Sequence, residues 1–268
     1  MPEAGRGACP GQTFLNPSPI YGPVHSRRFG LSLGVNLMPA SGKICTFDCL
    51  YCENGFDADR RTAEPHVPLE RVERELEATL ERMRDEGTPP DQITFAGNGE
   101  PTLSPAFPQA IEAAVRLRDS LAPQAKIGVL SNGTRADVPE VREALLLCDR
   151  PTLKLDTVSQ GFAEALDRPN VPYDIARQVE TYASYEGRIL IQTIFLRGSW
   201  QGNDFDNTSE SYVEPWLEAL RRIGPKGATI YTVDRTTPAD GLAKAPATVL
   251  DGIADRVRAL GIPCSVGY

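Results

Sequence analysis

The sequence predicts an α/β protein, in which a parallel sheet with outer helices closes partly or fully into a barrel. Seven short apolar runs, each bounded by turn residues, alternate with six segments of helical spacing. About six repeated β-α units place parallel strands side by side, with the helices outside. A length of 268 residues fits a single α/β barrel domain.

The elements follow one another along the chain with little between them. The first twenty residues, rich in Gly and Pro, predict an irregular lead-in before a single domain over 21–268. The predicted strands are Leu31–Leu37, Gln92–Ala96, Lys126–Leu130, Thr152–Leu155, Arg188–Leu196, Ala228–Val233 and Pro263–Val266. The predicted helices are Leu69–Asp85, Pro105–Leu121, Val138–Cys148, Val171–Tyr185, Ser209–Ile223 and Pro246–Leu260.

Composition narrows the function classes. The formal net charge of -8 argues against a broad phosphate-binding surface. No apolar run approaches the roughly 18 residues of a membrane span. The segment Met1–Pro10 lacks the features of a secretory signal, so we expect a cytoplasmic protein with reduced cysteines.

Three of the six cysteines form a tight cluster after the first predicted strand. Cys45, Cys49 and Cys52 have the spacing CxxxCxxC. Three thiolates on one loop can hold three irons of a cubane, leaving the fourth iron without a protein ligand from the motif. Zinc is the alternative, but a structural zinc site needs four ligands, and the only histidines are His25 and His66.

With Tyr51 at its aromatic position, the motif resembles the signature of the radical S-adenosylmethionine (SAM) superfamily. The resemblance implies that the three cysteines bind a 4Fe-4S cluster, and that SAM chelates the open iron. Reductive cleavage of SAM then gives methionine and a 5′-deoxyadenosyl radical that abstracts hydrogen from a substrate. The resemblance also implies that Tyr51 contacts the adenine; ordinary packing is the alternative.

A narrower resemblance comes from Tyr21-Gly-Pro-Val-His-Ser-Arg-Arg-Phe-Gly30, from Leu33-Gly-Val-Asn36 and from Tyr231-Thr-Val-Asp-Arg235. These segments are similar to wyosine-synthase-like iron-sulfur oxidoreductases. The similarity covers most of the chain. The name of that subgroup does not define an activity.

A glycine-rich polar turn follows the second predicted strand. It reads Gly97-Asn98-Gly99-Glu100, where the family has a GGE motif that binds the methionine amino group. Glycines permit a close backbone approach, and a carboxylate accepts hydrogen bonds from an ammonium group. Asn98 departs from the family pattern, which leaves open the backbone group that binds.

The next two strand ends carry further candidates. Ser131 and Asn132 occupy a turn similar to the family's TNG-like turn and are candidates to bind the ribose or the methionine carboxylate; a plain turn is the alternative. Lys154 and Asp156 alternate along a strand and share a face. If that face is the barrel interior, both are site residues. A purely structural Lys-Asp pair is the alternative.

Weaker candidates lie elsewhere. Gln192 and Thr193 interrupt an apolar strand, and Trp200–Thr208 is a candidate lid over the site. Asp234 and Arg235 are candidates for substrate binding or for an ion pair that closes a loop. Arg27 and Arg28 are candidates to hold an anion or to pair at the surface.

The leading interpretation is a radical SAM enzyme with one 4Fe-4S cluster and a small-molecule or protein substrate. The family resemblance implies an external reductant of the flavodoxin or ferredoxin type. The alternatives are a tRNA-modifying enzyme, which the acidic charge disfavours, and a non-enzymatic metal-binding or sensing module. The sequence assigns no catalytic side chain and no substrate.

Overall fold

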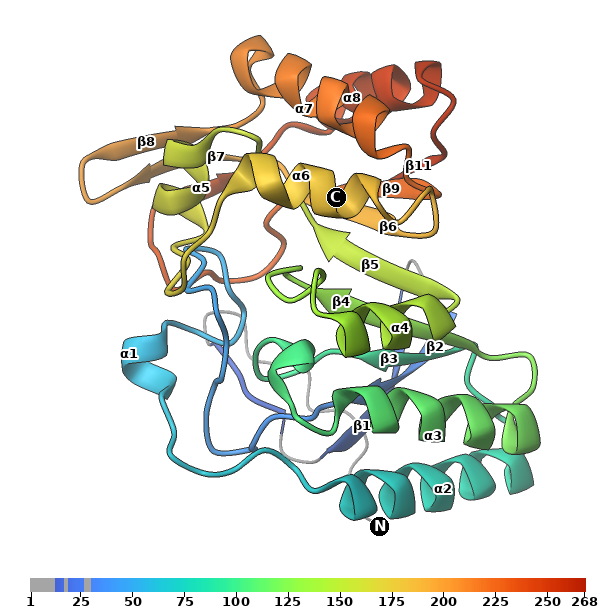
Figure 1. Ribbon diagram of the computed structural model, residues 1–268. Coiled ribbons are helices and arrows are strands. Elements are labelled where there is room, and N and C mark those ends of the chain that lie inside the picture. Colours follow the sequence, from blue (N-terminus) through green and yellow to red (C-terminus); the bar gives the residue numbers. More distant parts are fainter. Residues whose placement is uncertain (1–12, 17–18, 27–29) are drawn as a thin grey trace.

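The computed structural model describes residues 13–16, 19–26 and 30–268. Its main feature is a curled, mostly parallel sheet with helices along its outer face, which together form a partial barrel (Figure 1). The strand order is β1-β2-β3-β4-β5-β6-β9-β11, and β1 and β11 are the two ends of the sheet. The predicted fold class is therefore confirmed in its partial-barrel form.

All seven predicted strands are present, and they run parallel to one another. Their bounds are β2 (Gly30–Val35), β3 (Gln92–Phe95), β4 (Lys126–Ser131), β5 (Arg150–Lys154), β6 (Leu190–Ile194), β9 (Gly227–Tyr231) and β11 (Cys264–Gly267). An additional strand, β1 (Ile20–Ser26), pairs antiparallel with β2. The turn-rich sequence around Gly22 and Pro23 concealed this strand.

The six predicted helices are also present. They are α2 (Leu69–Asp85), α3 (Phe107–Leu121), α4 (Pro139–Leu147), α6 (Ile175–Ala183), α7 (Glu210–Ile223) and α8 (Ala247–Ala259). Three short elements were not predicted: α1 (Asp57–Arg60), the 3-10 turn η1 (Pro101–Leu103) and α5 (Gln160–Leu166). Among the described residues, no helix is long and apolar enough to cross a membrane.

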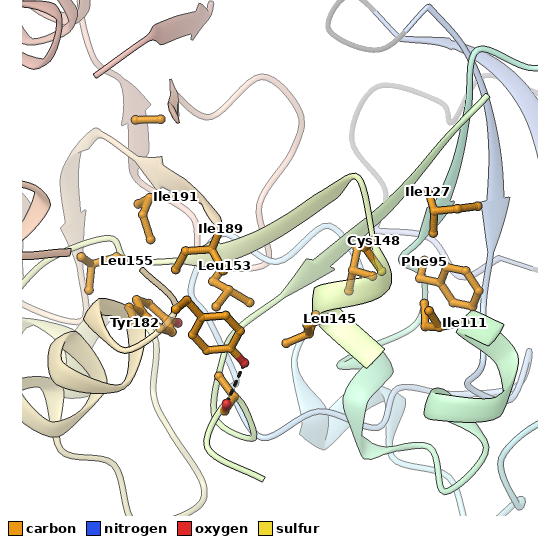
Figure 2. Packing of buried hydrophobic residues seen from close by; sticks show 14 of the residues in the cluster. Phe95, Ile111, Ile127, Leu145, Cys148, Leu153, Leu155, Tyr182, Ile189 and Ile191 are labelled. Atoms are coloured by element: carbon orange, nitrogen blue, oxygen red, sulfur yellow. Dashed lines mark hydrogen bonds between the residues drawn. The ribbon is translucent and has the colours of Figure 1, made fainter. Parts of the chain in front are cut away.

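Alternating side chains give the sheet one apolar face and one polar face. Phe95, Ile127, Leu153 and Ile191 come from four neighbouring strands and pack toward the helices (Figure 2). Helix residues such as Ile111 complete this buried layer. Apolar burial here is the main stabilising contribution, at roughly 25 cal/mol for each Å² removed from water.

The opposite face of the same strands carries small and polar groups. Ser32 and Thr94 hydrogen-bond to each other across β2 and β3 at 2.9 Å, and Gln92 donates to Thr94 at 2.8 Å. Gly34 lies against the ring of Tyr21, where an added Cβ would come within 2.1 Å of the ring. The concave side is therefore a polar lining, and it leads to the carboxyl ends of the strands.

A second, antiparallel sheet lies outside the barrel. The predicted strand Arg188–Leu196 divides after Ile194, and β7 (Leu196–Trp200) leaves the main sheet to pair with β8 (Asn203–Asp206) and β10 (Leu242–Lys244). The candidate lid Trp200–Thr208 thus begins as a β-hairpin. A second apolar cluster joins this sheet and α5 to the cysteine loop through Leu50, Phe162 and Phe205.

Candidate active site

The cysteine loop, defined as residues 45–52, is fastened to the glycine-rich turn of β3. Ile44 donates its backbone N–H to the carbonyl of Asn98 at 3.1 Å, and Glu100 donates to the carbonyl of Ile44 at 3.0 Å. This pairing requires Gly99, whose φ is +131° and whose added Cβ would lie 1.9 Å from the Ile44 carbonyl oxygen. Two of the sequence motifs are therefore adjacent.

Asn98, the residue that departs from the family motif, is fully buried and holds the surrounding loops together. Its side-chain oxygen accepts from Asn16 N at 2.7 Å, and its amide nitrogen donates to the Pro39 carbonyl at 3.0 Å. Its backbone N–H donates to Asn36 Oδ1 at 3.1 Å. Beside it, Gly97 has a φ of +155°, and an added Cβ would lie 2.5 Å from Asn36 Oδ1.

Glu100 is a buried carboxylate held by uncharged donors. Oε1 accepts from Thr102 N at 3.0 Å, from Thr102 Oγ1 at 2.6 Å and from Ser131 Oγ at 2.8 Å. Oε2 accepts from Asn132 N at 2.6 Å. A carboxylate offers about four lone-pair positions, so Oε2 retains room for a further donor. Burial raises the pKa of Glu100, and the bonds from Thr102, Asn132 and Ser131 oppose this shift.

The turn after β4 contacts the cysteine loop directly. Asn132 donates from Nδ2 to Thr46 Oγ1 at 2.8 Å and to Cys45 Sγ at 3.7 Å. The Thr46 hydroxyl also pairs with that of Thr134 at 2.8 Å. The backbone N–H of Phe47 donates to Cys45 Sγ at 3.5 Å. Hydrogen bonds to sulfur of this kind tune the potential of an iron-sulfur cluster.

The donor set of the loop is three thiols, from Cys45, Cys49 and Cys52. Burial raises the pKa of Cys45 to about 12, the pKa of Cys49 well above its ordinary value, and that of Cys52 as well. Metal ligation requires the thiolate form, so a bound metal would displace these protons. Three soft sulfur ligands on one loop fit three irons of a cubane.

A buried lysine lies behind the cysteine loop. Lys43 Nζ is 2.9 Å from Asp57 Oδ1 and 3.3 Å from Asp48 Oδ1, and it donates to the Gly55 carbonyl at 3.0 Å. Burial alone would lower its pKa, but the charges of Cys52 and Asp57 raise it instead. Lys43 therefore fastens both flanks of the loop and places positive charge near Cys52.

The structure brings the predicted pair Lys154 and Asp156 together with Tyr51. The Lys154 ammonium contacts Asp156 Oδ2 and the Tyr51 hydroxyl, which itself donates to Asp156. Asp167, which no sequence pattern indicated, completes the group at 2.9 Å from Lys154 Nζ. Tyr51 belongs to the cysteine loop, and the other three side chains lie beside it. Contact of Tyr51, Lys154 and Asp156 with the cosubstrate stays a prediction.

The weaker candidates have other surroundings. Thr193 donates to the Leu155 carbonyl at 2.8 Å within the barrel wall. Asp234 forms an ion pair with Lys244 at the end of β10 at 2.7 Å, and Arg235 forms one with Glu53, just after the cysteine loop, at 2.7 Å. Gln192 lies on β6 and is half-buried. Arg27, Arg28 and Cys9 lie outside the described residues.

Sequence reasoning missed Lys43 and Asp167. A signal existed for Lys43, since a lysine two residues before the first cysteine is flanked downstream by Asp48 and Asp57. No local signal marked Asp167, whose partner Lys154 belongs to a different element.

On the same side as α1, a hollow of about 630 Å³ lies against the cysteine loop. It is lined by Asp48, Asp57, Ala58, Arg61, Glu164, Arg168, Pro169 and Asn170.

A partial α/β barrel that brings three half-buried cysteines and a glycine-rich carboxylate turn together at its strand ends is typical of a cluster-binding enzyme of the SAM-dependent type. The Radical SAM superfamily model matches residues 41–199. The chain belongs to the radical SAM superfamily, whose members bind a 4Fe-4S cluster and SAM. The narrower wyosine-synthase-like resemblance stays a prediction.

Several relatives at the sequence level are UPF0026 proteins, a name that assigns no activity. The chain is 31% identical over 224 residues to a UPF0026 protein of Helicobacter pylori, covering 82% of this chain and 68% of that protein. It is 28% identical over 232 residues to a UPF0026 protein of Methanocaldococcus jannaschii, covering 84% and 66%. The chain therefore spans about two thirds of the length of these relatives.

Solved structures support the fold. A radical SAM methyltransferase from Sphaerobacter thermophilus superposes with a TM-score of 0.63 at 19% identity, covering 88% of this chain and 65% of the other. Streptococcus suis SuiB bound to S-adenosylmethionine gives a TM-score of 0.61 at 14% identity, covering 88% and 50%. At these identities the likeness concerns the fold alone.

Proposed function

We propose that this chain is a radical SAM enzyme in which Cys45, Cys49 and Cys52 hold the cluster and the Glu100 turn orients SAM. When bound, the cluster supplies the electron that cleaves SAM to methionine and a 5′-deoxyadenosyl radical, which abstracts hydrogen from the substrate. A reductant of the flavodoxin or ferredoxin type provides that electron. The observation that carries the proposal is the fastening of the cysteine loop to the glycine-rich turn through Ile44 and Gly99.

The residues around the loop have distinct tasks in this proposal. Glu100 Oε2, with one remaining acceptor position, receives the methionine ammonium group. Ser131 and Asn132 hold Glu100 in place, and Asn132 also donates to Cys45 Sγ. Gly97 and Gly99 let the turn pack closely against Asn36 and Ile44, which keeps Glu100 beside the cysteine loop. The partial barrel shields the radical from water.

A small molecule or a protein is the proposed substrate class. The net charge of -8 does not favour tRNA, whose binding depends on neutralising phosphates. The fold also accommodates peptides, since SuiB has been solved bound to the precursor peptide SuiA. Filter binding of total tRNA at two salt concentrations tests the alternative: tight, salt-sensitive binding would favour tRNA and contradict our proposal.

The central experiment is anaerobic reconstitution with iron and sulfide, followed by dithionite and SAM. The assay is 5′-deoxyadenosine by mass spectrometry in wild type, in Cys49→Ala and in the matched control Cys264→Ala. Cys264 lies on β11, away from the loop. We expect a full iron and sulfide complement and product in wild type and the control, and neither in Cys49→Ala. Zinc without iron or sulfide would overturn the proposal in favour of a metal-binding module.

A further inference from the structure

A closed group of four side chains lies beside Cys49. Lys154 Nζ lies 2.9 Å from Asp167 Oδ1 and also contacts Asp156 Oδ2 and the Tyr51 hydroxyl. The Asp156 and Asp167 side chains are 1% and 3% exposed, so both carboxylates are removed from water. Such burial is favourable only when each charge meets a partner. Lys154 is the shared partner of both.

The ammonium of Lys154 has no spare donor. It carries three N–H groups, and three acceptors surround it: one oxygen of Asp156, one of Asp167 and the hydroxyl oxygen of Tyr51. Asp156 is also committed, because its Oδ1 accepts from Ile194 N at 3.0 Å. The arrangement therefore suits holding Tyr51 better than binding a cosubstrate carboxylate.

The group holds Tyr51 by the hydroxyl end of its ring. Lys154 Nζ contacts the hydroxyl oxygen and lies 4.6 Å from the centre of the ring, so the ammonium lies beyond the hydroxyl and covers neither face. Tyr51 is only half-buried. The ring is therefore fixed at its polar end, while its face stays available for stacking with a planar ligand.

Asp167 fastens this group to the cysteine loop through its main chain as well. It is the C-cap residue of α5, and its carbonyl accepts from Asp48 N at 3.1 Å. The preceding carbonyl, that of Leu166, accepts from Leu50 N at 2.9 Å. The end of α5 is thus hydrogen-bonded to the loop on both sides of Cys49. The carboxylate of Asp167 contacts Lys154 beside the same loop.

We propose that Asp167 is a positioning residue that acts through Lys154 to fix the Tyr51 ring for stacking against the adenine of SAM. The inference rests on the proposed function, since it deepens the account of the same site. Asp167 itself touches neither cosubstrate nor cluster. Its substitution therefore changes the affinity for SAM without removing a cluster ligand.

The test uses the reconstituted protein, with SAM as the probe. The variants are Asp167→Asn, Tyr51→Phe, their double variant and the matched control Asp149→Asn. Asp149 also pairs with a cation and a backbone N–H, but it lies next to the amino ends of β4 and β5. The readouts are iron content, and the dissociation constant of SAM from equilibrium dialysis without reductant.

We expect full iron in every variant and wild-type SAM affinity in Asp149→Asn. Asp167→Asn should weaken SAM binding by about tenfold, the usual consequence of losing a charge-assisted hydrogen bond. Since both residues act through one ring orientation, the double variant should bind no more weakly than the weaker single variant. If Asp167 had a merely structural role, the factors by which the two single substitutions weaken SAM binding would instead multiply in the double variant.

Wild-type affinity in Asp167→Asn, or multiplying effects in the double variant, would overturn the inference while leaving the proposed function intact. Loss of iron in Asp167→Asn together with unchanged SAM affinity in Tyr51→Phe would also overturn it. Absence of cluster or of SAM binding in the wild-type protein would instead overturn the proposed function itself. The two failures are therefore distinguishable.

Discussion

Glu100 on the β3 side of the site and the Asp156–Asp167 pair on the β5 side are buried carboxylates, but they are held in opposite ways. Glu100 accepts hydrogen bonds from uncharged donors of Thr102, Ser131 and Asn132. Asp156 and Asp167 instead surround the ammonium of Lys154. Neutral donors leave a carboxylate its full negative charge, whereas a shared cation largely cancels it.

This difference separates two tasks within one site. The β3 side keeps an uncancelled charge and a free acceptor position, as binding a cationic group requires. The β5 side is a closed set whose charges are used internally, as positioning requires. Burial still raises the pKa of Asp167 to about 7, since one lysine cannot fully compensate two carboxylates.

Replacing the shared cation should have the largest effect. Lys154→Met keeps an unbranched side chain, one atom shorter, but leaves two buried carboxylates without their cation, so we expect the free energy of unfolding to fall by about 3–5 kcal/mol at pH 8. Urea unfolding of the apo protein measures this, with Lys126→Met as control. Lys126 is 54% exposed, and its substitution should cost less than about 0.5 kcal/mol.

The loss in the free energy of unfolding caused by Lys154→Met should also become smaller as the pH falls. Without the lysine, the pKa of Asp167 in the folded state rises further above its unfolded value, because the charge that opposes the effect of burial is gone. The folded state then binds more protons, so stability is recovered as the pH falls from 8 toward 5. An unchanged penalty across this range would contradict the charge-sharing account.

Glu100→Gln tests the other side and should have a smaller effect. The amide oxygen can keep the three bonds of Oε1, but the NH₂ group then faces the N–H of Asn132. One unsatisfied buried donor costs about 1–3 kcal/mol, and no unpaired charge is created. Urea unfolding beside the exposed helix variant Glu112→Gln measures it. A loss equal to that of Lys154→Met would break the comparison.

The difference between the two sides also explains what the sequence could predict. Glu100, Ser131 and Asn132 follow predicted strands, and parallel strand ends meet at one edge, so their association follows from the strand pattern. The apolar alternation likewise predicted the seven parallel strands and six helices, because burial against the helices sets the period.

The remaining features depend on contacts distant in sequence. Asp167 is 13 residues from Lys154 but 116 from Tyr51, and only the docking of α5 on the cysteine loop brings them together. The sheet of β7, β8 and β10 could not be predicted for the same reason. Its strand β10 has a pairing partner only when residues 242–244 return to β7. The periodicity of a segment does not indicate which distant segment it will pair with.

Asp149 lies near the surface and accepts hydrogen bonds both from an uncharged donor and from a cation. Its substitution should have the smallest effect on the free energy of unfolding. It accepts from Ile127 N at 2.8 Å and from Arg118 Nη1 at 2.9 Å, with 31% of its side chain exposed. Burial opposes ionisation, but the Ile127 bond and Arg118 lower the pKa of Asp149 below its usual value of 3.8. Because solvent screens the pair, we expect Asp149→Asn to cost about 1 kcal/mol at pH 7.

The pH dependence at Asp149 has the opposite sign to that in Lys154→Met. A lowered pKa means that the unfolded state binds more protons, so the contribution is fully present above pH 4 and is lost as the pH falls through the folded-state pKa. Urea unfolding between pH 7 and pH 3 should show wild type and Asp149→Asn converging at the acidic end. A difference in the free energy of unfolding that persists at pH 3 would mean that the Asp149 side chain acts by packing. Charge would then decide the effect of a substitution only at sites from which water is excluded.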